Sequence, residues 1–231
     1  MNSFNSLDLI DFHTHVLPGA DHGSSSLSTS LSQLSMARDA GIKHIVATPH
    51  FYPDRHTVDY FLERRRKSYD ELAPHITSAH PDIILGAEVL ICPGIDHMEG
   101  IETLCIKGTD SILIELPFSD FNTSYCDVAY KLRSSGMKVI LAHADRYPKE
   151  NIECMLDAGA MIQLNAASLC TVFKQKHLYD WLSRGLVVAL GSDIHGVDKK
   201  AYKHFLTALD RVRPFVPQIM QSSKEFLNLT I

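Results

Sequence analysis

The chain has 231 residues, of which 45% are apolar and 21% charged, and this ordinary globular composition excludes a disordered or fibrous protein. Its net charge of −5, from 22 basic and 27 acidic residues, argues against broad electrostatic binding of nucleic acid. No basic segment followed by an apolar stretch opens the chain, and its apolar runs are far shorter than the roughly 20 residues of a membrane span. We therefore expect a cytoplasmic protein without membrane insertion.

Seven short apolar runs, rich in β-branched residues, predict the buried strands of a parallel sheet. In chain order these strands cover residues 7–12, 42–48, 83–88, 111–116, 137–141, 160–164 and 186–190. Four of them follow a helical stretch and a glycine, at Gly41, Gly136, Gly159 and Gly185. Because glycine readily adopts the left-handed conformation that ends a helix, each of these units predicts a helix, a turn and a strand.

Helices are predicted between the strands, over residues 24–35, 58–72, 125–135, 151–158, 177–184 and 198–212. A serine is expected to cap the first helix, and the basic run from Arg64 to Lys67 is expected to form a solvated face of the second. No linker divides the chain, so we expect a single domain over residues 1–231.

The alternation of seven strands with helices predicts an α/β fold, a TIM-like (β/α)7 barrel one strand short of the usual eight. The alternative is an open doubly wound sheet. No glycine-rich phosphate motif follows any strand, which disfavours a dinucleotide-binding protein of that second type.

The chain has five cysteines and thirteen histidines. The cysteines are odd in number and include no Cys-x-x-Cys pair; they are Cys92, Cys105, Cys126, Cys154 and Cys170. This spacing indicates neither a zinc knuckle nor a redox pair, so we expect reduced thiols that pack as small core residues. The histidines are the unusual feature, because histidine is the commonest metal ligand.

Six of the seven predicted strands deliver histidine or a carboxylate at their C-terminal ends. These residues are His13 and His15, then His50, Glu88, Glu115, His143, and finally Asp193 with His195. In α/β barrels the C-terminal rim of the strands is where active sites are assembled. A single histidine at a strand end is more often a structural residue, but six strand ends with the same chemistry indicate a metal centre.

His13 and His15 lie two residues apart on one strand, so their side chains point to the same face and can meet one ion. Mixed histidine and carboxylate ligation suits Zn²⁺, Mn²⁺ or Fe²⁺, whereas an all-oxygen set would suit Mg²⁺ or Ca²⁺. Carboxylates such as Glu88 and Asp193 can bridge ions. The candidate ligands outnumber the needs of one ion, and we infer two or three.

Such a centre points to hydrolysis. A bound divalent ion lowers the pKa of its water from about 15.7 to about 7, and paired ions clamp the attacking and leaving oxygens of a displacement. Arg146, three residues beyond His143, is placed to hold a phosphate oxygen in a bidentate manner. The alternative for Arg146 is a structural ion pair with Asp145 or Glu150.

Five motifs in this order resemble the PHP (polymerase and histidinol phosphatase) superfamily of metal-dependent phosphoesterases. They are His13-x-His15, Thr48-Pro49-His50, Gly86-x-Glu88, Ala142-His143-x-x-Arg146 and Ser192-Asp193-x-His195. The first-loop string from Asp11 to Gly23 and the motif Glu115-Leu116-Pro117-Phe118 resemble one branch, the bacterial capsule and exopolysaccharide tyrosine-protein phosphatases. The similarity spans residues 7 to 197.

The resemblance implies a distorted seven-stranded barrel that holds up to three metal ions, most often manganese, with iron, zinc, cobalt and magnesium as alternatives. It places the ligands on His13, His15, His22, His50, Glu88, Glu115, His143, Asp193 and His195. His22 stands where the family usually has aspartate. The resemblance further implies that Arg146, His50 and His143 are catalytic and that Arg146, Lys200 and Arg55 bind substrate, with Lys200 in place of a second arginine.

The activity implied by this branch is hydrolysis of phosphotyrosine in protein, with a bacterial tyrosine autokinase as partner in capsule or exopolysaccharide regulation. No cysteine is followed six positions later by arginine, so thiol-based phosphatase chemistry is not expected. Three alternatives remain: a small-molecule phosphatase such as a histidinol phosphatase, a non-catalytic metal-binding partner of an envelope-assembly complex, and a nuclease of the amidohydrolase type. The motif from Glu115 to Phe118 favours the tyrosine branch.

Overall fold

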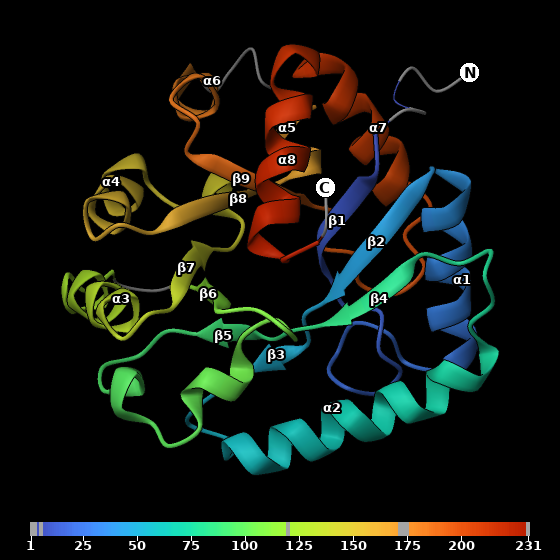
Figure 1. Ribbon diagram of the computed structural model, residues 1–231, viewed down its shortest axis with the longest axis horizontal. Helices are drawn as coiled ribbons and strands as arrows, with labels where there is room; N and C mark the ends of the chain where they lie inside the picture. The colour runs from blue at the N-terminus through green and yellow to red at the C-terminus, as the bar shows by residue number, and fades with distance from the viewer. Residues whose placement is uncertain (1–3, 5–6, 119–120, 171–175, 230–231) are drawn as a thin grey trace.

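The computed structural model describes residue 4 and residues 7–118, 121–170 and 176–229, and it shows strands surrounded by helices (Figure 1). All strand pairs in these ranges are parallel. The strands are β1 (Leu9–Thr14), β2 (Ile42–Ala47), β3 (His50–Phe51), β4 (Asp82–Leu85), β5 (Glu88–Leu90), β6 (Ser111–Glu115), β7 (Lys138–Leu141), β8 (Met161–Asn165) and β9 (Val187–Gly191). One sheet has the order β1-β2-β4 and the other β3-β5-β6-β7-β8-β9.

Two of the seven predicted strands are interrupted, which is why the described chain has more strands than the sequence predicts. The second, predicted over residues 42–48, ends as β2, and the short β3 follows it after Thr48 and Pro49. The third, predicted as continuous over residues 83–88, is divided into β4 and β5 at Gly86 and Ala87. Proline has no N–H to donate to a ladder, and glycine weakens a strand interior. Each interruption moves the chain from one sheet to the other.

The two sheets also meet at β1 and β9. Asp193 N donates to His13 O at 2.9 Å, and His15 N donates to Ile194 O at 3.3 Å, just beyond the end of β9. Together with the interrupted strands on the other side, this contact arranges the seven strand passages as a distorted α/β barrel of the TIM-like type. The predicted fold is confirmed, although the hydrogen-bonded ladder does not run continuously around the barrel.

Six helices confirm the predicted helical segments with ends shifted by a few residues. They are α1 (Leu27–Asp39), α2 (Val58–Leu72), α3 (Ser124–Ser134), α4 (Lys149–Asp157), α6 (Lys176–Ser183) and α7 (Ala201–Arg211). Ser26 caps α1 by accepting from Thr29 N at 3.3 Å. The glycines after the helices adopt φ between 70° and 102°, as predicted; they are Gly41, Gly136, Gly159 and Gly185. Within the described ranges, no helix is both long and apolar enough to cross a bilayer.

Two helices were not predicted, the short α5 (Ala166–Leu169) and α8 (Val216–Phe226). The buried face of α8 covers β9 and β1 (Figure 1). Ser223 Oγ donates to Val188 O of β9 at 2.9 Å, and Phe226 O accepts from Ser111 Oγ at 2.7 Å. The C-terminal helix is therefore part of the wall around the barrel.

The basic run on α2 corrects one prediction. Arg66 and Lys67 are exposed, but Arg65 turns inward and donates to Gly86 O at 2.7 Å, at the interruption between β4 and β5. Burial lowers the pKa of Arg65 from 12.5 to about 10. Arg65 satisfies a carbonyl group that the interrupted ladder leaves free, which the charge pattern alone did not indicate.

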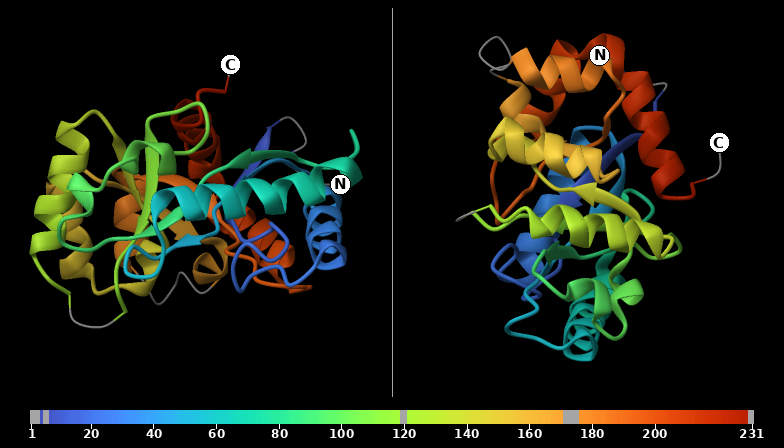
Figure 2. Two further views of the ribbon diagram at one scale, coloured as in Figure 1. Left: turned by 90° about the horizontal axis from the view of Figure 1, so that it is seen from below. Right: turned by 90° about the vertical axis from the view of Figure 1, so that its left-hand side faces the viewer.

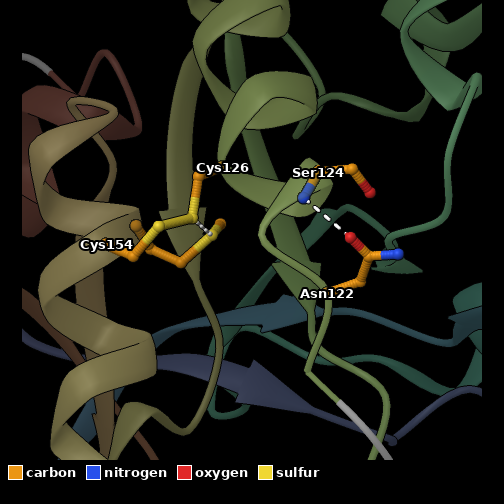
Figure 3. Close-up of a disulfide and its surroundings, with 5 residues drawn as sticks. Asn122, Ser124, Cys126 and Cys154 are labelled. Carbon is orange, nitrogen blue, oxygen red and sulfur yellow. Dashed lines mark hydrogen bonds between the residues drawn. A yellow bond between two sulfur atoms is a disulfide. The ribbon is translucent and has the colours of Figure 1, made fainter.

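The expectation of five reduced cysteines is wrong for two of them. Cys126 of α3 is bonded to Cys154 of α4 (Figure 3), while Cys92, Cys105 and Cys170 are free. These helices lie side by side at one end of the molecule (Figures 1 and 2), which brings residues 28 positions apart to a Cα–Cα distance of 6.2 Å. The Cys-x-x-Cys rule describes local pairs and does not detect a bond between neighbouring helices.

The start of α3 is also visible in Figure 3, where Ser124 N donates to Asn122 Oδ1 at 2.9 Å.

Candidate metal centre

Glu88 lies at the centre of the residues predicted to bind metal, and its side chain is fully buried. Its Oε2 atom lies 3.0 Å from His13 Nε2, 3.2 Å from His15 Nε2 and 3.0 Å from His50 Nδ1. Its Oε1 atom lies 2.7 Å from His143 Nε2. A single carboxylate thus faces four imidazoles, with its two oxygens turned toward different groups.

The strand interruptions position two of these side chains. Glu88 is the first residue of β5 and His50 the first residue of β3, and the two strands pair in the register that sets His50 opposite Glu88. His13 and His15 share one side of β1 and the segment after it, with their Nε2 atoms 3.2 Å apart. The side chains come from different strands but meet at one rim, as the parallel fold requires.

Four of these side chains form a first candidate ligand group. His13, His15 and Glu88 converge as described, and Asp193 Oδ1 lies 3.4 Å from His15 Nε2 and 3.7 Å from His13 Nε2. Ligands bound about 2.1 Å from an ion lie roughly 3.0 to 3.4 Å from each other, so these separations suit one common ion. The structure thus brings together four of the residues predicted as ligands, and their binding of one ion stays a prediction.

Two further groups overlap with the first. Ligand atoms of His50, Glu88 and Glu115 lie within 4.8 Å of one another, and so do those of His15, His50 and His195. Two atoms of the second group, His50 Nδ1 and Glu115 Oε1, are buried and make no hydrogen bond within the described chain, although they are 3.3 Å apart. Buried polar atoms without a partner are costly, and a divalent ion between them would satisfy both. The donor set therefore fits divalent cations.

The electrostatics of the cluster favour ionised carboxylates and protonated imidazoles. Burial opposes the charge of Glu88, but His13 and the other imidazoles around it outweigh burial and hold its pKa well below the usual value. Burial also disfavours protonated His50, yet Glu115 and Glu88 raise its pKa to about 9. His195, in contrast, is kept neutral by burial and by neighbouring His15, which lower its pKa to about 4. Without a bound ion, protonated imidazoles thus balance the buried carboxylates, a role that divalent cations can take over when they replace those protons.

Asp21 is a residue of the centre that sequence reasoning missed. Its Oδ2 accepts from His15 Nδ1 at 2.6 Å and from His50 N at 3.1 Å, and its Oδ1 accepts from Gly23 N at 2.8 Å. A carboxylate behind a histidine fixes the tautomer whose other nitrogen faces the ion. The signal was present in the string Asp21-His22-Gly23, but the ligand role was assigned to His22 alone.

A pocket of about 350 Å³ opens above the cluster. Its lining residues are His22, His50, Tyr52, Glu88, Glu115, Phe118, Arg146, Asp193 and His195. His22 is exposed at this rim, with its ring centroid 4.7 Å from that of His50. Phe118 is 76% exposed, and its ring is stacked at 16° to the ring of His143. The pocket combines ionic groups at its floor with an exposed aromatic ring at its mouth.

Arg146 has neither of the structural partners named as alternatives. Its guanidinium donates to Asp193 Oδ2, whereas Asp145 accepts from Asn165 N at 2.7 Å. The Arg146 side chain remains 38% exposed at the pocket, so an anion entering there would meet its other N–H groups. The pairing with Asp145 or Glu150 is therefore wrong, and the phosphate-binding role stays a prediction.

Two predicted substrate-binding cations do not line the pocket. Arg55 is exposed and lies over the ring of Tyr52 at 5.0 Å, and only Tyr52 of these two lines the pocket. Lys200 is exposed before α7, where its backbone N donates to Asp198 Oδ1 at 2.8 Å. Within the described ranges, Arg146 is the single arginine or lysine in the pocket lining.

Comparison with known proteins agrees with this geometry. The model of a family described as capsular polysaccharide synthesis, CpsB/CapC, matches residues 9–212. The chain belongs to the CpsB/CapC family. CapC of Staphylococcus aureus is 26% identical over 84% of this chain and 80% of that protein. The tyrosine-protein phosphatase YwqE of Bacillus subtilis is 26% identical over the same shares.

Solved structures share the fold. The structure described as YwqE from Bacillus subtilis and CpsB from Streptococcus pneumoniae, metal-dependent tyrosine phosphatases, superimposes with a TM-score of 0.79 at 22% identity, covering 96% of both chains. A 2-pyrone-4,6-dicarboxylic acid hydrolase from Acinetobacter baumannii reaches 0.55 at 12% identity, covering 96% of this chain and 100% of that one. These matches support the barrel architecture.

Proposed function

We propose that this protein is a metal-dependent protein tyrosine phosphatase of capsule or exopolysaccharide regulation. The observation that carries the proposal is Glu88, which joins overlapping groups of candidate ligands directly below a pocket that contains Arg146. Family membership supports it, and so do the names of the relatives from Bacillus subtilis and Streptococcus pneumoniae, both tyrosine-protein phosphatases. The three free cysteines lie outside the pocket lining, in keeping with chemistry that needs no thiol.

Two or three divalent ions, with manganese preferred, would be held by the nine residues predicted above. When bound, such ions would lower the pKa of water and offset the charge on phosphate oxygens. His13, His15, Glu88 and Asp193 fit one ion, while His50 and Glu115 fit a second. Imidazole nitrogens favour manganese, iron or zinc over magnesium, which prefers oxygen ligands.

The residues of the chain itself would bind and orient the phosphate ester. Arg146 would hold a non-bridging oxygen and stabilise the charge that develops during transfer. His50 lines the pocket, and both His50 and His143 contact Glu88; we propose that these two histidines take part in catalysis together with Arg146. The exposed ring of Phe118 offers an apolar surface to the phenyl ring of phosphotyrosine.

The partner that we propose is a phosphotyrosine protein, a bacterial tyrosine autokinase, in the cytoplasm. We also propose that residues 1–231 form one domain. Its support is a single apolar core whose buried members run from Phe4 to Leu227 and include residues of every strand except β4, whose apolar side chains are partly buried against it.

The test is the turnover of a phosphotyrosyl peptide against that of histidinol phosphate, each with Mn²⁺ present. We expect the peptide to be hydrolysed with the higher kcat/KM, and we expect Glu88→Gln to abolish both activities. Preference for histidinol phosphate would favour the small-molecule phosphatase. Absence of both activities in a protein that binds Mn²⁺ would favour the non-catalytic alternative.

A further inference from the structure

Among the seven strand passages of the described chain, the one formed by β8 contributes no candidate metal ligand. β8 ends instead in Gln163 and Asn165, two amides that lie two residues apart and therefore on the same face. Both are removed from solvent, at 0% and 6% exposure. Two polar residues inside the apolar run from Met161 to Asn165 are a signal of a buried polar face, which the sequence reasoning did not use.

The orientation of the Gln163 amide follows from its neighbours. Its Oε1 accepts from His143 N at 2.7 Å, and because a backbone N–H can only donate, the oxygen must lie on that side. The same oxygen lies 3.2 Å from His13 Nδ1, which must then carry a proton. Protonated Nδ1 leaves the lone pair on Nε2, and this is the nitrogen of His13 that faces Glu88 and His15.

The opposite end of the amide continues the chain of hydrogen bonds. Gln163 Nε2 donates to Asn165 Oδ1 at 3.1 Å, and Asn165 Nδ2 donates to Asp193 Oδ2 at 3.1 Å. Because Asn165 binds Oδ2 of Asp193, the other oxygen, Oδ1, faces His15 in the first ligand group. Gly191 makes this packing feasible, since a Cβ atom there would lie 2.6 Å from His13 Cβ and 2.7 Å from Gln163 Nε2.

We propose that Gln163 and Asn165 are positioning residues of the metal centre, an amide relay that orients His13, His143 and Asp193. The inference rests on the metal centre of the proposed function. Gln163 is hydrogen-bonded to both His13 and His143. It also donates to Asn165, which in turn binds Asp193. Groups of this kind fix the tautomer and direction of ligands, and their loss typically weakens metal binding by about 10- to 100-fold.

The test is the affinity of the full chain for Mn²⁺, measured by competition with a chelator. We expect Gln163→Leu to weaken binding by about 10- to 100-fold and Asn165→Leu to weaken it less, because Asn165 supports Asp193 alone. The double variant should bind no more weakly than Gln163→Leu, since Asn165 is oriented through Gln163. Gln163→Glu keeps the acceptor for His13 and His143 but loses the donor to Asn165, so it should resemble Asn165→Leu.

The matched control is Ser111→Ala. Ser111 is also fully buried and hydrogen-bonded, to Phe226 O, but it starts β6, at the end away from Glu115. It should lose stability without losing Mn²⁺ affinity. The relay would be overturned if Gln163→Glu and Asn165→Leu both kept an Mn²⁺ affinity within threefold of the unaltered protein. It would also be overturned if Ser111→Ala lost as much Mn²⁺ affinity as these variants, or if the losses of affinity were additive in the double variant. An unaltered protein that binds no Mn²⁺ would overturn the relay together with the proposed function.

Discussion

Asp193 and His143 share a backbone conformation that ordinary side chains rarely adopt. Asp193 has φ of 52° and His143 φ of 33°, and among the described residues only Asn228 is another non-glycine residue with positive φ. Such strain persists where surrounding contacts over-determine the position, and it concentrates at functional sites. Here His143 N donates to Gln163 Oε1 and Asp193 N donates to His13 O, and these hydrogen bonds supply those contacts.

Arg146 carries the sharpest prediction for a single residue. We expect Arg146→Ala to keep the fold and the bound metal but to lose about 10²- to 10³-fold in kcat, the range for removal of one charge-stabilising donor. Arg146→Lys should recover part of this loss, because an ammonium group cannot reproduce the planar fork of a guanidinium. The measurement is kcat together with metal content and Tm for each variant. Near-normal kcat with a lowered Tm would show that the pair with Asp193 is structural only.

The raised pKa of His50 leads to a prediction of how the stability of the metal-free protein depends on pH. Burial disfavours its protonated form, but Glu115 and Glu88 outweigh burial and raise its pKa from 6.5 to about 9. A pKa that is higher in the folded state means that protonation stabilises the fold fully below pH 6.5 and that this contribution disappears as the pH rises through about 9.

The free energy of unfolding of the chelator-treated protein should therefore fall between those two pH values. Denaturant titration measures this slope, and His50→Gln should reduce it. Mn²⁺ should reduce it too, because metal ions replace the protons on the ligands. A free energy of unfolding that is constant or rises over this range would contradict the assignment of the charges.

At the scale of the elements, the interrupted strands decide the geometry of the site. β3 has only two residues, yet its pairing with β5 sets His50 against Glu88. If the third strand had continued unbroken from β4, Glu88 would pair with the sheet of β1 and β2 rather than with β6. The side chain of Arg65 stabilises this interruption by binding Gly86 O.

The bond between α3 and α4 yields a prediction that separates stability from chemistry. Replacing Cys126 and Cys154 together by serine should lower stability by roughly 3 to 4 kcal/mol, the loop-closure contribution for residues 28 apart. Activity should stay within about tenfold, because neither cysteine lines the pocket. Thermal unfolding and phosphotyrosyl-peptide turnover are to be measured on the same sample, and Cys105→Ser serves as a comparison. A folded variant without turnover would point to thiol chemistry.

For the whole molecule, metal removal is the decisive experiment. A chelator should abolish turnover, and Mn²⁺ should restore it at least as well as Mg²⁺ because the cluster is rich in imidazole nitrogen. Mn²⁺ at 100 times its Kd should stabilise the fold by about 2.7 kcal/mol, which corresponds to a rise in Tm of roughly 5 to 10 °C. Full activity after complete metal removal would exclude the proposed mechanism.

The sequence by itself determined the features that depend on local pattern. Apolar β-branched runs and the glycines after helices predicted seven strand passages and six helices, since periodicity and turn chemistry act over a few residues. The rim position of His13, His15, His50 and Glu88 followed from the rule that parallel strands end together. α8 was missed although its buried residues keep helical spacing, because Pro214 and Pro217 resemble a break in the sequence but lie where a helix accepts proline, near its start.

Only the tertiary structure decided the partners of these residues. Asp193 rather than Asp145 faces Arg146, Cys126 meets Cys154, and Gln163 reaches His13 across 150 positions of sequence. No local pattern contains such pairs, because they depend on which strands become neighbours and on where a strand is interrupted. The residue types of the site could therefore be predicted from the chain, while the contacts that orient them arise from the way the two sheets meet.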